Sequence, residues 1–313
     1  MSISKEIERL QQAKKDIGDA IVRKGGSVSG TIDTYAKSIM ALGDVSFRTA
    51  IDIVNKSDAK NVDLTMISPK NEKSLYALIF RNTNIVNIDV SNWDTSNITS
   101  FNFAFASNPN LKSVDFADWN VSNVTSFYAM FDGCNEIKKI DISKWVTSSA
   151  TNMAWMFNGN SLKHLDVSNF NTSKVTNMNN MFSHCNSLSK LDISNFDTSN
   201  VLNFGSVFSN WSTACEELNI SGLNLTRCTS INNTFTGTKF NVIRCDGLRL
   251  PNIDMSNIGL NSSTSLTVDS IVGLLNALPQ SDKGYSFQIG SVNIAKLSDE
   301  QKAIATNKGW TLI

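Results

Sequence analysis

The chain has 313 residues, of which 41% are hydrophobic and 18% charged, so it carries enough apolar material for a core and too much for a disordered chain. Basic and acidic residues number 28 each, and a chain without net charge lacks the field that attracts nucleic acid or an anionic membrane. The charged first 18 residues and the lack of a long apolar run argue against a membrane span or an export signal, so we expect a cytosolically made, unprocessed chain without membrane insertion.

Residues 1–43 are predicted to form a helical attachment or oligomerisation segment. A helix is expected over residues 5–24, because Ser4 precedes it, Glu6 lies in its first turn and two glycines follow it, and a second over residues 32–42. Apolar residues in the first helix alternate in steps of four and three, a coiled-coil seam interrupted by Lys14: Ile3, Ile7, Leu10, Ile17 and Ile21. Two interpretations stay open: the helix caps the rest of the chain, or it docks onto a partner.

The segment EIERLQQAKKDIGDAIVRKGGSV, residues 6–28, followed by IDTYAKSI, is similar to N-terminal segments of bacteriophage tail-associated and fibre proteins. In those proteins such a segment joins a virion-attachment helix to a variable recognition module. The resemblance implies binding to other virion proteins, or to copies of the same chain, through this helix.

A repeat of 25 to 27 residues fills the middle of the chain. Its anchor column holds Asp63, Asp89, Asp115, Asp141, Asp166, Asp192, Asn219 and Asp246. A phenylalanine follows 16 residues after six of these anchors, at Phe105, Phe131, Phe157, Phe182, Phe208 and Phe235. A period of this length predicts a solenoid, in which stacked coils bury the recurring apolar columns.

Each repeat is predicted to contain a short strand, a turn and a short helix. Leu191 and Ile193 alternate with polar residues, as in a strand with one buried face. Hydroxyl residues seven positions after the anchors are interpreted as helix N-caps: Ser96, Ser122, Ser148, Ser173, Ser199 and Thr226. Val175, Met178 and Phe182 then recur at helical spacing.

The string L-x-x-L-x-I-x-x-F, formed by Leu188, Leu191, Ile193 and Phe196, is followed by DTSNV and resembles the leucine-rich repeats of the BspA-like bacterial surface-antigen class. The resemblance covers residues 60–250 and implies an α/β solenoid for adhesion and recognition, without enzymatic activity. Two departures are the absence of an export signal and the degenerate end repeats, as in residues 65–80.

The last 51 residues are predicted to close the solenoid. A helix is expected over residues 268–278, a strand over 285–290, and a second helix that a capping box of Ser298 with Gln301 opens and Gly309 ends, before a final strand. The fold class is therefore α/β: a leucine-rich-repeat solenoid with a parallel sheet and short helices, a helical N-terminal segment and a C-terminal α/β cap. The expected domain bounds are 1–43, 44–262 with about eight coils, and 263–313.

The candidate ligand-binding face lies on the outward positions of the strands. It consists of Asp115, Asp141, Asp166, Asp192, Ser143, Ser168 and Ser194. Stacked carboxylates repel, so they either bind cations or a polar ligand, or accept hydrogen bonds from local groups. Tyr128 and Trp155, outside the core columns, could stack on sugars.

No catalytic, metal or cofactor site is predicted. His164 and His184 lie at different phases of the repeat, so no Ser-His-carboxylate triad can be assigned, and the five cysteines are interpreted as free thiols. The sequence favours a non-enzymatic phage virion component that binds a host-surface glycan or protein. The alternative is a cellular leucine-rich-repeat adhesin of a gut bacterium, located at the cell surface.

Overall fold

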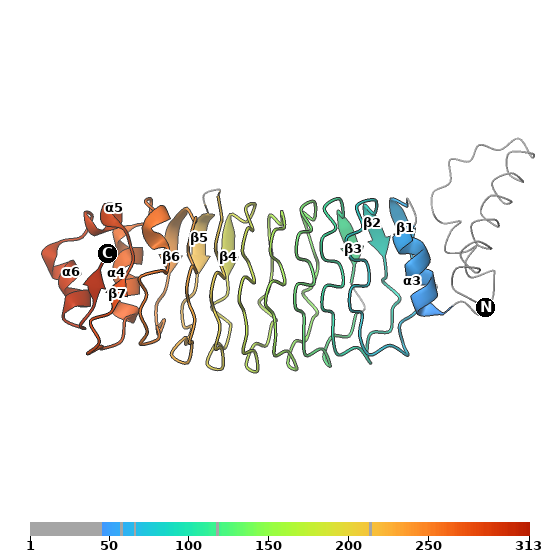
Figure 1. Ribbon diagram of the computed structural model, residues 1–313, viewed down its shortest axis with the longest axis horizontal. Helices are drawn as coiled ribbons and strands as arrows, with labels where there is room; N and C mark the ends of the chain where they lie inside the picture. The colour runs from blue at the N-terminus through green and yellow to red at the C-terminus, as the bar shows by residue number, and fades with distance from the viewer. Residues whose placement is uncertain (1–45, 57–58, 66, 117–118, 213–214) are drawn as a thin grey trace, which may run out of the picture.

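The computed structural model describes residues 46–56, 59–65, 67–116, 119–212 and 215–313. The predicted helices over residues 5–24 and 32–42, and the seam from Ile3 to Ile21, lie outside the described residues. In the described part, the chain winds into a row of similar coils stacked along one axis (Figure 1).

Six coils of the described part carry a short strand on one side, and these strands form two parallel sheets. The first sheet contains β1 (Asn61–Asp63), β2 (Asn87–Asp89) and β3 (Ser113–Asp115), and the second contains β4 (Lys190–Asp192), β5 (Cys215–Asn219) and β6 (Phe240–Arg244). Register follows the anchor column, because Asp63 pairs with Asp89 and Asp89 with Asp115. The predicted leucine-rich-repeat-like solenoid with parallel strands is confirmed.

The last predicted anchor is wrong by two residues. Asn219 pairs with Arg244, so Arg244 and not Asp246 occupies the anchor column. Five residues further on, Asn224 pairs with Arg249, which keeps the same register through the following turn. The last step of the repeat is therefore 25 residues.

The return side of each coil is not the short helix that the spacing predicted. Between α3 (Phe47–Lys56) and the 3-10 helix η1 (Leu260–Ser262), the described residues form no helix. Instead the N–H groups of Phe101, Phe103 and Phe105 donate to Ser126, Tyr128 and Met130 of the next coil. These bonds and a chain of parallel bridges from Ser74 to Ser230 form a second ladder, which we call the return ladder.

Left-handed backbone conformations explain why the return side does not become a helix. The residues 14 and 18 positions after the anchors have positive φ in every coil from the first to the seventh, as Phe103 (57°) and Ser107 (58°) do in the second. A positive φ every four residues interrupts a right-handed helix, and the freed N–H groups point to the neighbouring coil. Backbone groups are thus paired between coils rather than within a turn.

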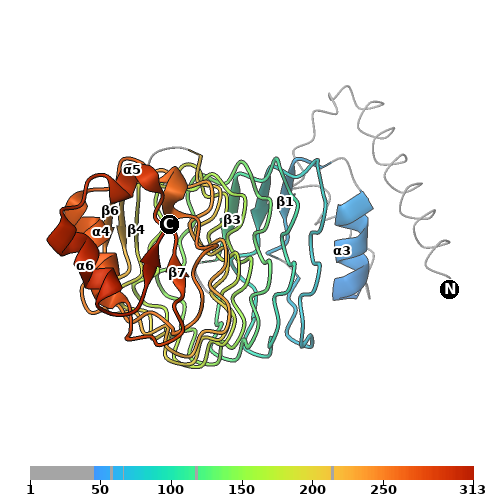
Figure 2. The ribbon, with the colours of Figure 1, turned by 60° about the vertical axis from the view of Figure 1, so that its left-hand side comes forward.

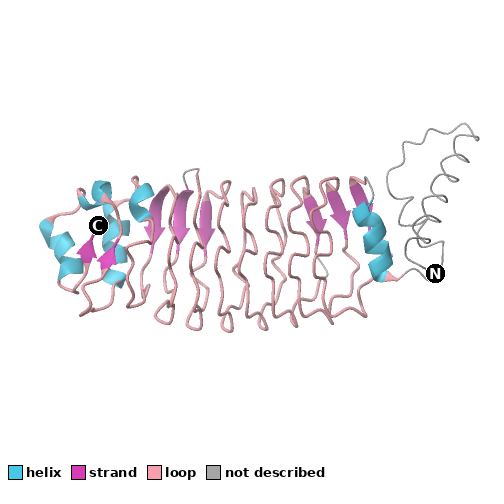
Figure 3. Ribbon diagram, in the orientation of Figure 1, coloured by secondary structure: helices cyan, strands magenta, loops and turns pink. Residues whose placement is uncertain are grey.

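The strand side is interrupted in the middle of the solenoid, whereas the return ladder is continuous. Residues 139–141 and 164–166 occupy the strand position of two coils between β3 and β4 but form no strand (Figure 3). The apolar side chains of Val114, Ile140 and Leu165 are only partly buried there. The solenoid is therefore more open on this side.

The core consists of aromatic columns that run along the solenoid axis. Phe157 and Phe182 stack with ring centroids 5.8 Å apart and 4° between planes, and Phe182 stacks on Phe208 at 6.3 Å. The whole phenylalanine column is buried, as predicted. Trp93 stacks on Trp119, and each indole N–H donates to a carbonyl of the preceding coil. Side chains from both sides meet in this core, as Phe105 and Phe116 do at 5.6 Å.

The turns after the strands are held by side-chain acceptors, but not by the predicted ones. Asp94 Oδ1 accepts hydrogen bonds from the backbone N–H and the hydroxyl of Ser96, at 3.0 and 2.6 Å. Ser96 was predicted to be an accepting N-cap, yet its hydroxyl donates. Ser122, Ser173, Ser199 and Thr226 donate to the Asn or Asp two residues before them in the same way. These are Asx turns, in which the acidic or amide side chain is the acceptor.

Both ends of the solenoid are covered by helices (Figure 2). At the N-terminal end α3, which the sequence did not predict, buries Ala50, Ile51 and Val54. Asn55 Nδ2 donates to Leu78 O at 2.8 Å, and Arg48 pairs with Glu72 and donates to Ser74 O. The backbone carbonyls that the first coil would otherwise leave exposed thus find partners in α3.

The C-terminal end agrees with the prediction. It contains α4 (Val268–Ala277), β7 (Ser286–Phe287), α5 (Ser291–Ile294), α6 (Asp299–Thr306) and β8 (Thr311–Leu312). The capping box of Ser298 and Gln301 is present, and Lys308 Nζ donates to three carbonyls at the end of α4. In the described part of the chain, no helix has the length and apolarity to cross a membrane.

Candidate functional site

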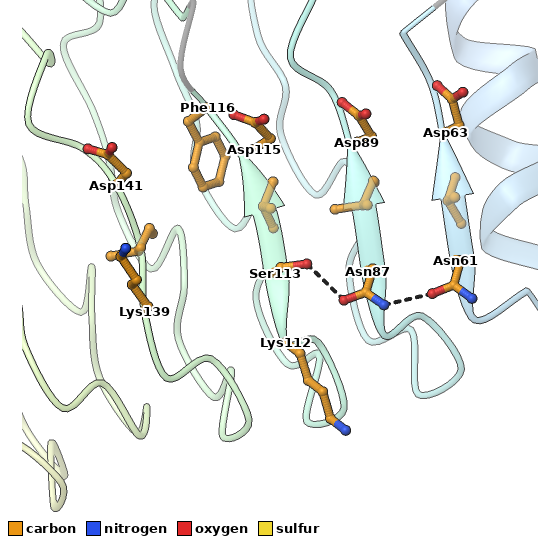
Figure 4. Close-up of a pocket in the computed structure, with 14 residues that line it drawn as sticks. Asn61, Asp63, Asn87, Asp89, Lys112, Ser113, Asp115, Phe116, Lys139 and Asp141 are labelled. Atoms are coloured by element: carbon orange, nitrogen blue, oxygen red, sulfur yellow. Dashed lines mark hydrogen bonds between the residues drawn. The ribbon is translucent and has the colours of Figure 1, made fainter.

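Two rows of polar side chains cross the outward face of the first sheet (Figure 4). The first row contains Asp63, Asp89, Asp115 and Asp141. The second, two residues earlier in each coil, contains Asn61, Asn87, Ser113 and Lys139. Within the second row, Asn87 Nδ2 donates to Asn61 Oδ1 at 2.7 Å, and Ser113 Oγ donates to Asn87 Oδ1 at 2.8 Å. The rows are therefore fixed by strand register and by side-chain contacts.

A shallow groove of about 750 Å³ lies over these rows, from β1 to residues 139–141. Two partly buried apolar residues also line the groove, Val114 in β3 and Ile140 in the next coil, where the strand ladder is interrupted. The lysines Lys112 and Lys139 add positive charge to the same surface. A groove of this kind offers carboxylates, amides, ammonium groups and apolar contacts to a ligand that lies across several coils.

The predicted site residues all lie on the strand side, but only two of them line the groove. Asp115 and Asp141 belong to it, whereas Asp166 and Asp192 continue the row in the next two coils. Ser143, Ser168 and Ser194 are exposed two residues after their aspartates. Backbone hydrogen bonds between strands set the spacing of the aspartates within each sheet. Residues 139–141 and 164–166 form no strand, so Asp141 and Asp166 are not held by such a ladder.

Local hydrogen bonds compensate the carboxylates of this row. Asp141 Oδ1 accepts from the hydroxyl and the N–H of Ser143, and these bonds lower the pKa of Asp141. Asp166 accepts from Ser168 N–H, and its pKa is lowered chiefly by Ser168. Burial works to raise the pKa of Asp192, but bonds from Ser194 and from Asn219 Nδ2 outweigh it and the pKa is lowered. Of the two interpretations of the row, the one based on local hydrogen bonds accounts for these contacts.

Metal ligands and nucleophiles are not brought together in the described residues. They contain no group of three or more His, Cys, Asp or Glu side chains arranged to hold a metal ion. His184 Nδ1 lies 2.9 Å from Ser183 Oγ, but Ser183 is fully buried and also contacts Ser209, so its hydroxyl cannot reach a substrate.

The cysteines are buried free thiols, as predicted. Burial raises the pKa of the Cys134 thiol to about 12 and that of Cys245 to about 11. At neutral pH these groups stay protonated, which leaves them without the thiolate that a catalytic or metal-binding cysteine needs.

The amide and hydroxyl row of the groove was missed by the sequence analysis. Its signal was present, because the position two residues before each anchor is polar from the first repeat to the seventh, whereas the position between it and the anchor is apolar. The repeat did not indicate the groove itself, because a pattern of polar and apolar positions does not show where the surface is hollowed.

Comparison with known proteins places the repeats in a family. The profile of the family described as "Mycoplasma protein of unknown function, DUF285" matches residues 54–162 and 126–244. No curated protein matches the chain.

Two solved structures are similar to parts of the chain. A leucine-rich repeat protein from Bacteroides ovatus is 13% identical, with 69% of each chain covered and a TM-score of 0.25. The functional domain of InlJ from Listeria monocytogenes is also 13% identical, with 74% of this chain and 67% of that chain covered and a TM-score of 0.16. Because both TM-scores are low, the description of the fold rests on the coils and hydrogen bonds of this chain alone.

Proposed function

The chain belongs to the DUF285 family of mycoplasma proteins of unknown function, and from that premise we propose that it is a non-enzymatic recognition protein of a cell surface. The proposed ligand is a glycan or protein on a host surface, bound across several coils on the strand side. The groove over β1, β2, β3 and residues 139–141 is the candidate binding site (Figure 4).

One observation carries this proposal: the outward positions of the strands differ from coil to coil while the inward positions stay apolar. Asn61, Asn87, Ser113, Lys139 and His164 occupy equivalent outward places. The inward residues beneath them are apolar in every one of these coils, and the phenylalanine column behind them is buried throughout. Such a surface can change to suit a ligand without loss of the fold, as in other solenoid binding proteins.

A second candidate function is that of a phage virion component. It is supported by the predicted apolar seam of residues 3–21, through which the chain would attach to other virion proteins or to a second copy, while α3 covers the first coil. The family match supports the cellular adhesin better, so the virion component remains the second proposal.

The test is binding of the full chain to cultured intestinal epithelial cells. Lys112→Glu with Lys139→Glu reverses two charges of the groove, and Lys163→Glu with Lys174→Glu makes the same charge change at exposed lysines outside it. We expect at least a fivefold loss of cell binding for the groove variant, no loss for the control variant, and unchanged melting of both. Equal binding by the two variants would show that the groove is not the binding site.

A further inference from the structure

The outward surface of the return ladder changes character along the solenoid. Its aromatic residues are all in the first four coils: Tyr76, Phe80, Phe103, Tyr128 and Trp155. At the positions equivalent to Tyr128 and Trp155, the later coils carry small or amide residues: Asn179, Asn180, Gly205, Ser206, Asn232 and Asn233. The fold therefore tolerates small polar residues in places where the first coils carry rings.

Four rings of the first three coils are connected through Phe103, and together with Trp155 of the fourth coil we call them the aromatic row. Phe103 makes edge-to-face contacts with Tyr76 at 5.8 Å, with Phe80 at 5.8 Å and with Tyr128 at 5.0 Å. Tyr76 is 58% exposed, and the other rings are partly exposed. The guanidinium of the exposed Arg81 lies 4.8 Å from the centre of the Phe80 ring. Trp155 continues the row in the fourth coil.

Two of these rings stand where a bulky side chain is unfavourable. Phe103 has a φ of 57° and Trp155 a φ of 62°, in the left-handed region that large side chains seldom occupy. Ala77, Asn180 and Ser206 serve at the equivalent place in other coils. The fold does not require a large side chain at these places, yet Phe103 and Trp155 accept the conformational cost of a positive φ. This indicates that the exposed rings serve a function at the surface.

Polar groups beside the rings indicate the chemistry of the ligand. Asn102 accepts a hydrogen bond from Ser126 Oγ through its side-chain oxygen, and Asn152 accepts one from Ala154 N–H. Each amide nitrogen is left as a donor next to the row. The positions 13, 14, 17 and 18 residues after the first four anchors contain no Leu, Ile, Val or Met, so the surface lacks the aliphatic groups that commonly fill an apolar protein interface.

We propose that the aromatic row binds an extended carbohydrate chain, whose apolar ring faces stack on Phe103, Tyr128 and Trp155 while Asn102 and Asn152 donate hydrogen bonds to its hydroxyl groups. The three rings belong to successive coils, which are about 4.8 Å apart, so a ligand that contacts all of them must extend along the solenoid axis. The neutral chain makes nucleic acid a poor alternative for the same rings. This inference rests on the proposed recognition function but uses the other side of the coils.

Trp155 provides a local signal for the test. It is the one partly exposed tryptophan of the six, because the other five are between 1 and 4% exposed. The full chain is titrated with cellohexaose, N-acetylchitohexaose and a hyaluronan hexasaccharide, by calorimetry and by acrylamide quenching of tryptophan fluorescence. We expect at least one of these probes to bind and to protect Trp155 from the quencher.

Matched variants locate the binding. Phe103→Asn with Tyr128→Asn introduces the residues that the chain itself carries at the same places, Asn180 and Asn179, so folding should be retained. We expect at least a tenfold loss of affinity for this variant, and unchanged affinity for the control variant Lys163→Glu with Lys174→Glu, whose substitutions lie outside both the groove and the aromatic row.

Three results would overturn the inference. They are binding of none of the three hexasaccharides, equal affinity of the wild type and the aromatic variant, and conversion of an oligomer to a monomer by the aromatic variant, which would make a second copy the occupant of the row. Any of these three results would overturn only the carbohydrate proposal. The proposed recognition function would still stand if the groove variant Lys112→Glu with Lys139→Glu loses cell binding. Loss of the proposed function would instead appear as unchanged cell binding by the groove variant.

Discussion

Phe182 illustrates how one side chain holds neighbouring coils together. It is fully buried and lies between Phe157 and Phe208 in the stacked column. Phe182→Ala should lower the free energy of unfolding by about 3–5 kcal/mol, because it removes a buried ring and leaves a cavity between two others. Urea denaturation followed by circular dichroism measures this loss.

The control for Phe182 is a turn residue of the same repeat. Ser173 is partly exposed, and its hydroxyl donates to Asn171 Oδ1 at 2.7 Å. Ser173→Ala should cost no more than about 1 kcal/mol, because the backbone N–H of residue 173 keeps its bond to Asn171. Two equally harmless substitutions would contradict the assignment of the phenylalanine column as the core.

The charge of Asp197, the acceptor of one Asx turn, should make the stability of the protein depend on pH. Its Oδ1 accepts from the hydroxyl and the N–H of Ser199, and these bonds lower the pKa of Asp197 in the folded chain. The stabilisation is complete above the unfolded value of about 3.9 and is lost as the pH falls through the lower folded value. Because the group is exposed, it amounts to no more than about 0.5 kcal/mol.

Asp197→Asn separates the charge from the turn. Asn171 makes the same two bonds to Ser173 without a charge, so the variant should keep the turn. Measured as melting temperature against pH, the variant should lose less stability than the wild type between about pH 5 and pH 2. Parallel curves would mean that the carboxylate does not contribute through its charge.

Among the elements, two glycines with positive φ make different demands on their turns. At Gly259 (φ 86°) a Cβ would lie 2.5 Å from Thr236 N, whereas at Gly133 (φ 70°) the nearest atom would be Ser107 Cα at 3.6 Å. Gly133→Ala should therefore cost about 1 kcal/mol for conformation alone. Gly259→Ala should cost about 3 kcal/mol or more, since the backbone must also move. Thermal denaturation of both variants tests this order, and a reversed order would contradict it.

The strand side of the coils could be predicted from the sequence, whereas the return side could not. Strands were visible because Leu191 and Ile193 alternate with polar residues and because the pattern recurs. The return side was mistaken for a helix, since the spacing of Val175, Met178 and Phe182 fits either a helix or a ladder with a left-handed residue between. Asn180, Asn210 and Asn233 are residues that favour a positive φ, but Phe103 and Trp155 at equivalent places are not, so the sequence does not show a left-handed residue in every coil.

The candidate site was predictable in part for a related reason. Outward aspartates follow from strand alternation, and two of them, Asp115 and Asp141, line the groove. The groove extends over residues 139–141, where the strand ladder ends, and nothing in the sequence of the repeat indicates that end. The aromatic row depends on the contacts of Phe103, which lie between coils and not along the sequence.

At the scale of the whole molecule, the covering of both ends decides what the first residues are free to do. The first coil is closed by α3, through Ile51 and Val54 in its buried face and Asn55 at a coil carbonyl. The last coil is closed by α4 and α6 (Figure 2). End coils of a solenoid need such covers, and the described residues provide one at each end.

We therefore expect residues 1–43 to serve for attachment. A helix over residues 5–24 would be about 30 Å long, longer than one terminal coil requires, and its seam could bury apolar contacts against a neighbour. A chain lacking residues 1–27 should keep the melting temperature of the solenoid but lose self-association, measured by analytical ultracentrifugation. Ile7→Ser with Leu10→Ser and Ile17→Ser should have the same effect without truncation.

The matched control for the seam keeps the number of substitutions and changes the face of the predicted helix. Gln11→Ser, Lys15→Ser and Asp19→Ser lie off the seam and should leave self-association unchanged. If the truncated chain unfolds at a lower temperature, the segment stabilises the solenoid directly and acts as a second cover beside α3. If the truncated chain and the seam variant both associate like the wild type, the seam is not a docking surface, and the virion proposal loses the physical argument on which it depends.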